Sequence, residues 1–246
     1  MALLSTVKLL IEMTGRNDLV VDLTNYAEPT SGLGARYWLN RAQRLLDRVQ
    51  VTPQSDAWYI TKPVAGTYTI QMAQCRAITE FWYTNSDGER AKIERVQLDN
   101  FRSYYYKDVS EYDQGVPEFY AIQQFRQAPS QQGIVPDAGT DDYQDLIIGA
   151  ADTYQGIIFM PPSDGTVSYR IKGKFYCKVL TADVDTSYWT EECPEALVLA
   201  AKWFLEGMYK NESGLNSLMA ALQPILDSIE MDNIETESAG VIQMEG

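Results

Sequence analysis

The chain contains no histidine, and this absence excludes several classes of enzyme. Histidine is the most frequent general base, a frequent metal ligand and the residue whose charge changes near neutral pH. A Ser-His-Asp or Cys-His catalytic site therefore cannot be built within these 246 residues. Cysteine is also scarce. Cys75, Cys177 and Cys193 show no C-x-x-C spacing, which predicts reduced, buried thiols in an intracellular setting.

Positive charge and long apolar runs are scarce as well. The chain has 20 Lys and Arg residues against 34 Asp and Glu residues, a formal net charge of −14. This balance disfavours a protein that grips nucleic acid through its phosphates, and it fits a surface that DNA passes without sticking. No apolar run approaches the length of a membrane span, and residues 1–13 lack the solid apolar stretch of a signal peptide.

Two kinds of periodicity divide the chain. Helical spacing of apolar residues predicts helices over residues 5–14, with Ser5 as the N-cap, over 35–49, from Pro194 onward, and over 215–229. The middle of the chain alternates instead, which predicts strands, with a short helix at about 99–107. The expected strands cover residues 67–72, 76–84, 117–125, 156–160 and 166–179.

These patterns predict an α+β fold. Short amphipathic helices at the two ends of the chain would each lack a partner alone, so we expect them to form one helical bundle. An antiparallel β domain would be inserted between them. The expected divisions are residues 1–53 with 181–229 for the helical core, 54–180 for the β domain, and 230–246 for an extended acidic arm. The arm is expected because no basic residue follows Lys210 and the last helical stripe ends near Ile229.

One stretch near the C-terminal end is unusually informative. It reads Leu-Thr-Ala-Asp-Val-Asp-Thr-Ser-Tyr-Trp over residues 180–189, and the helix from Pro194 follows. Together with residues 14–20 and 34–48, this stretch is similar to segments of the head-to-tail adaptor (connector) proteins of tailed bacteriophages. The similarity covers roughly residues 1–50 and 155–210, and it lies in packing motifs rather than in a catalytic signature.

The resemblance implies a structural virion protein and not an enzyme. By analogy with the family, many copies, expected to be twelve, would form a ring at the head-tail junction between the portal protein and the tail nozzle or tail proteins. DNA would pass through the lumen of the ring without specific binding. The resemblance implies no cofactor, no metal and no membrane association.

Candidate interface residues come from two places. Arginines form the only compact basic feature of the sequence, on the helix at 35–49, and apolar residues are scattered through the acidic arm. Either set could meet the portal or a neighbouring subunit, although a solvated helix face and a loose terminus would look the same. The candidates are Arg36, Arg41, Arg44, Arg48, Ile234, Val241, Ile242 and Met244.

Other interpretations remain open at this stage. The aromatic, β-rich middle and the acidic excess also suit a virion-associated tail protein that binds or cleaves host carbohydrate, and a tail-terminator ring would differ little in chemistry. Asp183 and Asp185 have the spacing of a metal-binding D-x-D motif, but a polar turn gives the same spacing.

Overall fold

The computed structural model describes residues 1–29, 32–72, 74–85, 88–104, 112–125 and 154–238. The protein is a mixed α+β protein, as expected, and it divides into two compact units. The helical unit consists of Met1–Ser55 with Tyr176–Gly246, and the β unit consists of Asp56–Phe175. The sequence places these junctions after residues 53 and 180. Among the described residues, none of the helices combines the length and the apolar character that a bilayer span requires.

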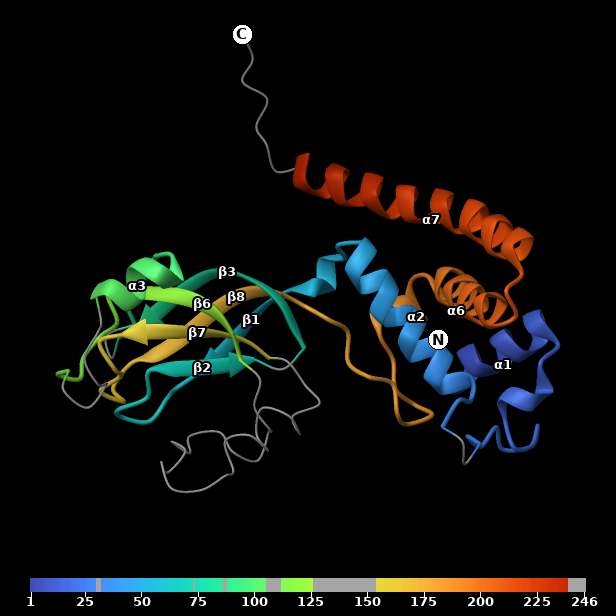
Figure 1. The fold of residues 1–246 in the computed structure, drawn as a ribbon, viewed down its shortest axis with the longest axis horizontal. Helices are drawn as coiled ribbons and strands as arrows, with labels where there is room; N and C mark the ends of the chain where they lie inside the picture. The colour runs from blue at the N-terminus through green and yellow to red at the C-terminus, as the bar shows by residue number, and fades with distance from the viewer. Residues whose placement is uncertain (30–31, 73, 86–87, 105–111, 126–153, 239–246) are drawn as a thin grey trace, which may run out of the picture. The chain divides into compact units, whose positions relative to one another are not determined.

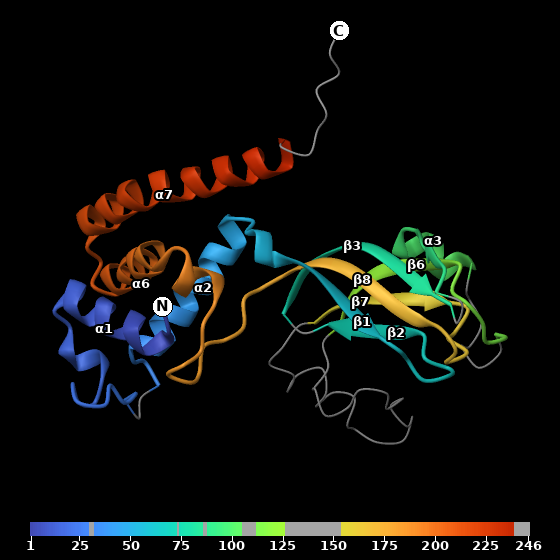
Figure 2. The same ribbon diagram turned by 180° about the vertical axis from the view of Figure 1, so that it is seen from behind.

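Helices from both ends of the chain make up the helical unit (Figures 1 and 2). Helix α6 packs against α1, α2, α5 and α7, and α1 also packs against α2. One hydrophobic cluster runs through these elements, with Trp189, Leu39 and Leu197 fully buried in it. The elements are α1 (Leu3–Thr14), η1 (Asn17–Leu19), α2 (Ala35–Val49), η2 (Pro53–Ser55), α5 (Tyr188–Glu191), α6 (Pro194–Met208) and α7 (Glu212–Ser238).

Most of the helix boundaries follow from local chemistry. Gly15 ends α1 in the left-handed region at φ 66°, where a residue without Cβ carries no steric penalty. Pro194 occupies the first turn of α6, where its missing N–H costs no hydrogen bond. At the end of α2 burial does not follow hydrophobicity, because Val49 is 59% exposed whereas the polar Gln43 and Asp47 are buried.

Helix α7 corrects the prediction of an extended arm from residue 230. The helix continues through Pro224 to Ser238, so residues 230–238 are helical. Figures 1 and 2 show it as one continuous helix. Glu and Met residues favour helix in this segment, although Ile229 is the last buried residue among those whose burial the structure describes. The last expected arm residues, 239–246, lie outside the described residues.

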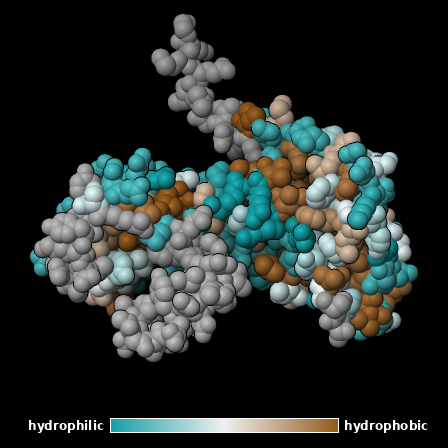
Figure 3. Space-filling view, viewed as in Figure 1, coloured by the Kyte–Doolittle hydropathy of each residue, from teal (hydrophilic) through white to brown (hydrophobic). Residues whose placement is uncertain are grey.

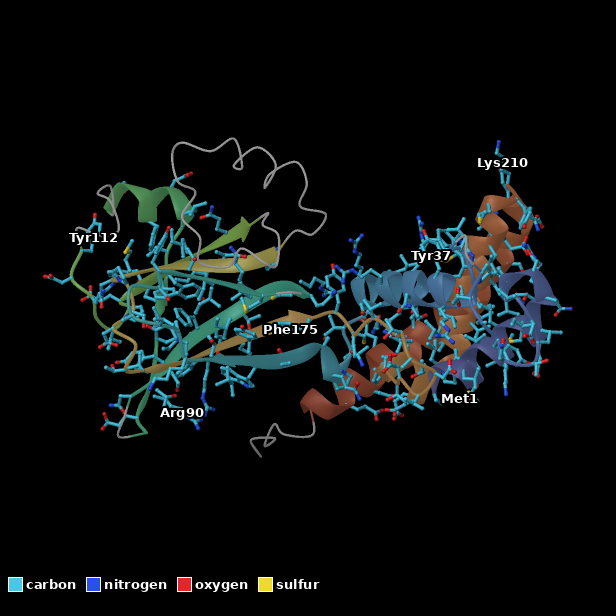
Figure 4. All side chains as sticks on the ribbon, turned by 90° about the horizontal axis from the view of Figure 1, so that it is seen from below. Met1, Tyr37, Arg90, Tyr112, Phe175 and Lys210 are labelled. Carbon is cyan, nitrogen blue, oxygen red and sulfur yellow. The ribbon has the colours of Figure 1, made fainter. Side chains whose placement is uncertain are left out.

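The β unit contains two four-stranded sheets. Sheet A has the order β1-β8-β3-β4 and sheet B has the order β2-β7-β6-β5. Sheet A is antiparallel throughout, but β5 pairs with β6 in parallel, which corrects the expectation of a purely antiparallel domain. Figure 4 shows Phe175 where β8 ends and Tyr112 at the opposite end of the unit. The strands are β1 (Asp56–Thr61), β2 (Thr69–Met72), β3 (Cys75–Thr84), β4 (Arg90–Lys92), β5 (Glu94–Arg95), β6 (Phe119–Phe125), β7 (Tyr154–Met160) and β8 (Ser168–Phe175).

An aromatic core joins the two sheets. Phe81 of β3 lies 5.4 Å from Tyr120 of β6, 5.7 Å from Phe159 of β7 and 5.2 Å from Tyr169 of β8, measured between ring centroids. Edge-to-face packing of this kind adds to the stabilisation from burial. The other face of sheet B is covered by α3 (Leu98–Tyr104), whose Phe101 shares a small cluster with residues of β6 and β7.

Candidate partner-binding surfaces and the polar clamp of helix α2

Four polar side chains on α2 face one extended segment of the chain. Arg36, Asn40, Gln43 and Asp47 are spaced by four, three and four residues, which places them on one face of the helix. All four bond to residues within 177–183. We call these four residues the α2 clamp. The segment they hold overlaps the 180–189 stretch that resembles the adaptor family.

Asn40 and Gln43, the two middle residues of the clamp, bond to main-chain groups of the segment as a neighbouring strand would. The side-chain oxygen of Asn40 accepts the Leu180 N–H at 2.8 Å, and its amide nitrogen donates to the Leu180 carbonyl at 2.8 Å. Gln43 donates to the Lys178 carbonyl, also at 2.8 Å. Extended main chain against a helix would otherwise leave buried donors and acceptors unpaired, and these amides satisfy them.

Arg36 forms the N-terminal end of the clamp. Its guanidinium donates to the Thr181 carbonyl at 2.8 Å and forms an ion pair with Asp183. Glu28 lies 3.7 Å from the same guanidinium and accepts the main-chain N–H of Arg36 at 2.7 Å. The side chain of Arg36 is only 22% exposed. This arginine therefore has partners within its own chain on several sides.

Asp47 forms the other end and is buried beneath the segment. One carboxylate oxygen accepts the indole N–H of Trp189 at 2.8 Å, and the other accepts the main-chain N–H of Cys177 at 2.8 Å. The Cys177 thiol lies 3.2 Å from the first oxygen. Hydrogen bonds to an ionised acceptor are stronger than neutral ones, so Asp47 fixes both an aromatic anchor and the start of the extended segment.

The environment of Asp47 also determines the state of the nearby thiol. Burial, reinforced by the adjacent Asp47 carboxylate, raises the pKa of Cys177 to about 12. A thiol with this pKa remains protonated and is a poor nucleophile at neutral pH. Cys177 was expected in a strand but lies just beyond β8, and its thiol is free, as are those of Cys75 and Cys193.

Asp183 and Asp185 organise a loop that contacts the start of α1. The carboxylate of Asp185 accepts the main-chain N–H groups of Ala182 and Thr181, and these bonds lower its pKa well below the ordinary range. The carbonyl groups of Asp185 and Asp183 accept the first main-chain N–H groups of α1, those of Leu3 and Leu4, at 2.9 and 3.1 Å. The structure thus caps α1 from the far end of the chain, and the expected Ser5 cap is wrong.

The remaining candidate arginines all contact aromatic side chains. The Arg44 guanidinium sits 3.3 Å from the centroid of the Tyr176 ring, and Arg48 donates to the Tyr176 hydroxyl at 3.4 Å. Arg41 lies 4.9 Å from the centroid of the Phe204 ring and donates to the hydroxyl of Tyr37, which Figure 4 labels on α2. Cation–π contacts of this type hold the arginine side chains along the helical unit.

Among the apolar candidates, only Ile234 belongs to the described residues. Ile234 lies on α7 and is 53% exposed, near Met231, which is 60% exposed. Figure 3 shows apolar atoms on the surface at this end of α7. The other three candidates, Val241, Ile242 and Met244, lie outside the described residues.

The described acidic residues do not gather as metal ligands. Within the ranges that the structure covers, no group of three His, Cys, Asp or Glu side chains could hold a metal ion. A small pocket of about 200 Å³ lies where α1 and α6 end, lined in part by Arg16, Lys202 and Tyr209. Arg16 is already paired with Asp18 at 2.6 Å.

Comparison with models of known protein families and with curated protein sequences gave no match. The chemistry of this chain must therefore be judged from its own residues. The sequence analysis overlooked Asn40, Gln43 and Asp47. Their spacing with Arg36 was the available signal, because polar residues repeating at a helical period predict a buried polar seam as well as a solvated face.

Proposed function

We propose that this chain is a head-to-tail adaptor of a tailed bacteriophage, a structural virion protein rather than an enzyme. The helices from both chain ends would form a bundle that builds a ring, expected to hold twelve copies, between the portal and the tail nozzle or tail proteins. DNA would pass through the lumen on its way out of the head without being bound specifically.

One observation carries the proposal. Residues 34–48 and 180–189, which resemble the adaptor family, are the two sides of the α2 clamp. Residues Asn40 and Leu180 are 140 positions apart in the sequence, yet they exchange two hydrogen bonds. The resemblance therefore falls on residues that depend on one another physically, which supports a shared helical architecture more strongly than separate short matches would.

Charge gives a second, weaker support. A net charge of −14 suits a channel wall along which DNA slides, because like charges prevent adhesion of the phosphate backbone. Two of the candidate interface residues, Arg41 and Arg44, lie on α2 with exposed positions. In the proposed ring, they would face an acidic surface of the portal or of a neighbouring subunit.

The test is the mass of the assembled protein, alone and with a portal. The adaptor proposal predicts that the chain binds isolated portal rings and forms a ring of about twelve subunits, seen by native mass spectrometry and electron microscopy. Arg41→Glu combined with Arg44→Glu should weaken this binding, while Arg90→Glu on β4 serves as a control. A protein that ignores portals but binds or hydrolyses host polysaccharide would instead favour the carbohydrate-binding alternative.

A further inference from the structure

Strand β1 is an edge strand of the β unit that exposes large apolar side chains. It pairs with β8 on one side, and no strand among the described residues pairs with its other side. Trp58, Tyr59 and Ile60 are 48%, 37% and 57% exposed. An edge strand turns alternate N–H and C=O groups outward, and a long apolar edge invites pairing with another chain.

The other sheet edges differ from β1. Strand β4 has only three residues, of which Arg90 and Lys92 carry charge, and β5 has two residues, both charged. Strand β2 has four residues, alternately buried and half-buried. Short and charged edges resist pairing, whereas β1 is six residues long with large apolar side chains at its centre.

The two faces of β1 follow from its register with β8. Trp58 lies opposite Lys172, whereas Tyr59 lies opposite Ile171, which is fully buried. Because side chains alternate along a strand, Asp56, Trp58 and Ile60 share the outer face, while Ala57, Tyr59 and Thr61 share the core side. Lys62 directly follows the last residue of β1, and the same alternation would place it on the outer face once pairing extends the strand by one residue. The strand is also limited in length, since Pro63 has no N–H to donate to a partner strand.

We propose that β1 pairs antiparallel with β1 of a second copy of this chain, about a two-fold axis at Tyr59. This register places Asp56 opposite Lys62 of the second copy and Trp58 opposite its Ile60, and symmetry repeats each pair. Opposite charges and aromatic–β-branched pairs are favourable cross-strand neighbours. Sheet A would then continue across the axis as one sheet of eight strands.

Neighbouring registers lack this complementarity. Pairing must join residues of the same face, so the strand can shift only in ways that keep outer residues opposite outer residues. Centring the axis on Trp58 would set Asp56 against Ile60, and centring it on Ile60 would set Trp58 against Lys62. Only the register at Tyr59 matches charge with opposite charge. This self-complementarity identifies a second copy as the occupant, rather than an unrelated strand.

The inference goes beyond the proposed adaptor function and does not depend on it. A two-fold contact closes at two copies, whereas a ring needs a contact between two different surfaces of the subunit. The pairing therefore describes an association of the free chain. Loss of the pairing and loss of portal binding are separate results, and either can occur without the other.

Charge exchange at the two ends of β1 tests the pairing. In Asp56→Lys, lysines face each other at both ends of the pair, and in Lys62→Asp, aspartates do. Each variant alone should raise the dimer dissociation constant roughly tenfold or more in sedimentation velocity. An equimolar mixture of the two variants should restore a heterodimer, because every facing pair is again of opposite charge.

A cross-link at the axis provides a second measurement. Tyr59→Cys should form a disulfide-linked dimer under mild oxidation, because the two introduced thiols would face each other. Ala57→Cys is the matched control on the same side of the strand, and it should remain unlinked because Ala57 faces Thr61 of the second copy. Circular dichroism establishes that each variant is folded, since Asp56 also forms an ion pair with Lys172 at 3.2 Å.

Several results would overturn the proposal. The wild-type chain could remain monomeric at its highest soluble concentration. It could form dimers that neither charge variant weakens, or the mixture could fail to form heterodimers, which would place the contact elsewhere. Finally, a monomer with strong hydrogen-exchange protection of the outward amides of β1 would mean that the chain covers its own edge.

Discussion

Replacement of Asp47 by alanine should strongly destabilise the helical unit. The substitution removes the acceptor of the indole N–H of Trp189 and of the main-chain N–H of Cys177, both at 2.8 Å, and it also removes the 3.2 Å contact with the Cys177 thiol. Trp189 is 0% exposed, so water cannot replace the lost partner without opening the cluster. Each buried donor left unpaired costs about 1–3 kcal/mol, which gives a loss of roughly 2–6 kcal/mol. Domains are typically stable by only about 5–15 kcal/mol.

A double-mutant cycle separates this hydrogen bond from general damage to the core. Trp189→Phe removes the indole N–H but retains an aromatic ring. If the hydrogen bond between Asp47 and Trp189 stabilises the protein, Asp47→Ala should lower the free energy of unfolding less in the Trp189→Phe background than in the wild type. The difference between the two losses should be about 1 kcal/mol or more. The free energy of unfolding of Asp47→Asn should lie between those of the wild type and Asp47→Ala, because an amide has one accepting oxygen whereas the carboxylate accepts with both of its oxygens.

Urea unfolding followed by the helical circular dichroism signal measures these free energies, because the long helices lie in the helical unit. Glu230→Ala, at an exposed position of α7, is a matched control for loss of one acidic side chain and should change the free energy of unfolding by less than about 0.5 kcal/mol. An Asp47→Ala protein within that same range of the wild type would refute the role assigned to the carboxylate.

Further predictions concern the core, the pH dependence and the thiols. Leu197→Ala should lower the free energy of unfolding by about 2–5 kcal/mol because Leu197 is fully buried. Phe204→Ala should lower it by less, because the Phe204 ring is only partly buried beneath Arg41. Equal losses for the two variants in urea unfolding would contradict this order. Asp185 has a pKa below its ordinary value of 3.8, owing to the N–H groups and ammonium group that it binds. The contribution of the Asp185 carboxylate to the free energy of unfolding should be complete above about pH 3.8 and should be lost as the pH falls further. The unfolding midpoints of the wild type and of Asp185→Asn should therefore converge in acid. The thiol of Cys177 should resist maleimide at pH 8 in the folded protein and react after unfolding, as read by mass spectrometry; rapid labelling of the native chain would show that the thiol is open.

The sequence predicts best where one local signal dominates. Helix α2 spans Ala35–Val49 as expected, and α6 begins at Pro194 as expected. In both cases an apolar period of 3.6 coincides with a clear boundary residue. Trp189, a large aromatic residue shortly before α6, is fully buried. Packing of this kind is readable from the sequence because apolar burial depends mainly on residue type and spacing.

The sequence does not predict which distant residues a polar group bonds to within the fold. The start of α1 depends on carbonyl groups of Asp183 and Asp185, about 180 residues away, so local inspection favoured Ser5 instead. Asp47 looked like one of several charges on a helix face, and only the tertiary structure shows that it lies beneath Trp189. Strand β1 escaped prediction because its central residues are exposed on both faces and therefore show no alternation.

The arrangement of strands explains how the β unit can interrupt the helical unit without disturbing it. Strand β1 enters the β unit at Asp56 and strand β8 leaves it at Phe175, and these two strands are paired neighbours, with Asp56 opposite Lys174. The insertion therefore begins and ends at one place, and no long linker is needed to bring the flanking chain together. Beyond β8, from Cys177 onward, the main chain bonds to the side chains of the α2 clamp. The two ends of the inserted β unit are thus held next to each other by β1–β8 pairing, and the core of the helical unit begins where that pairing stops.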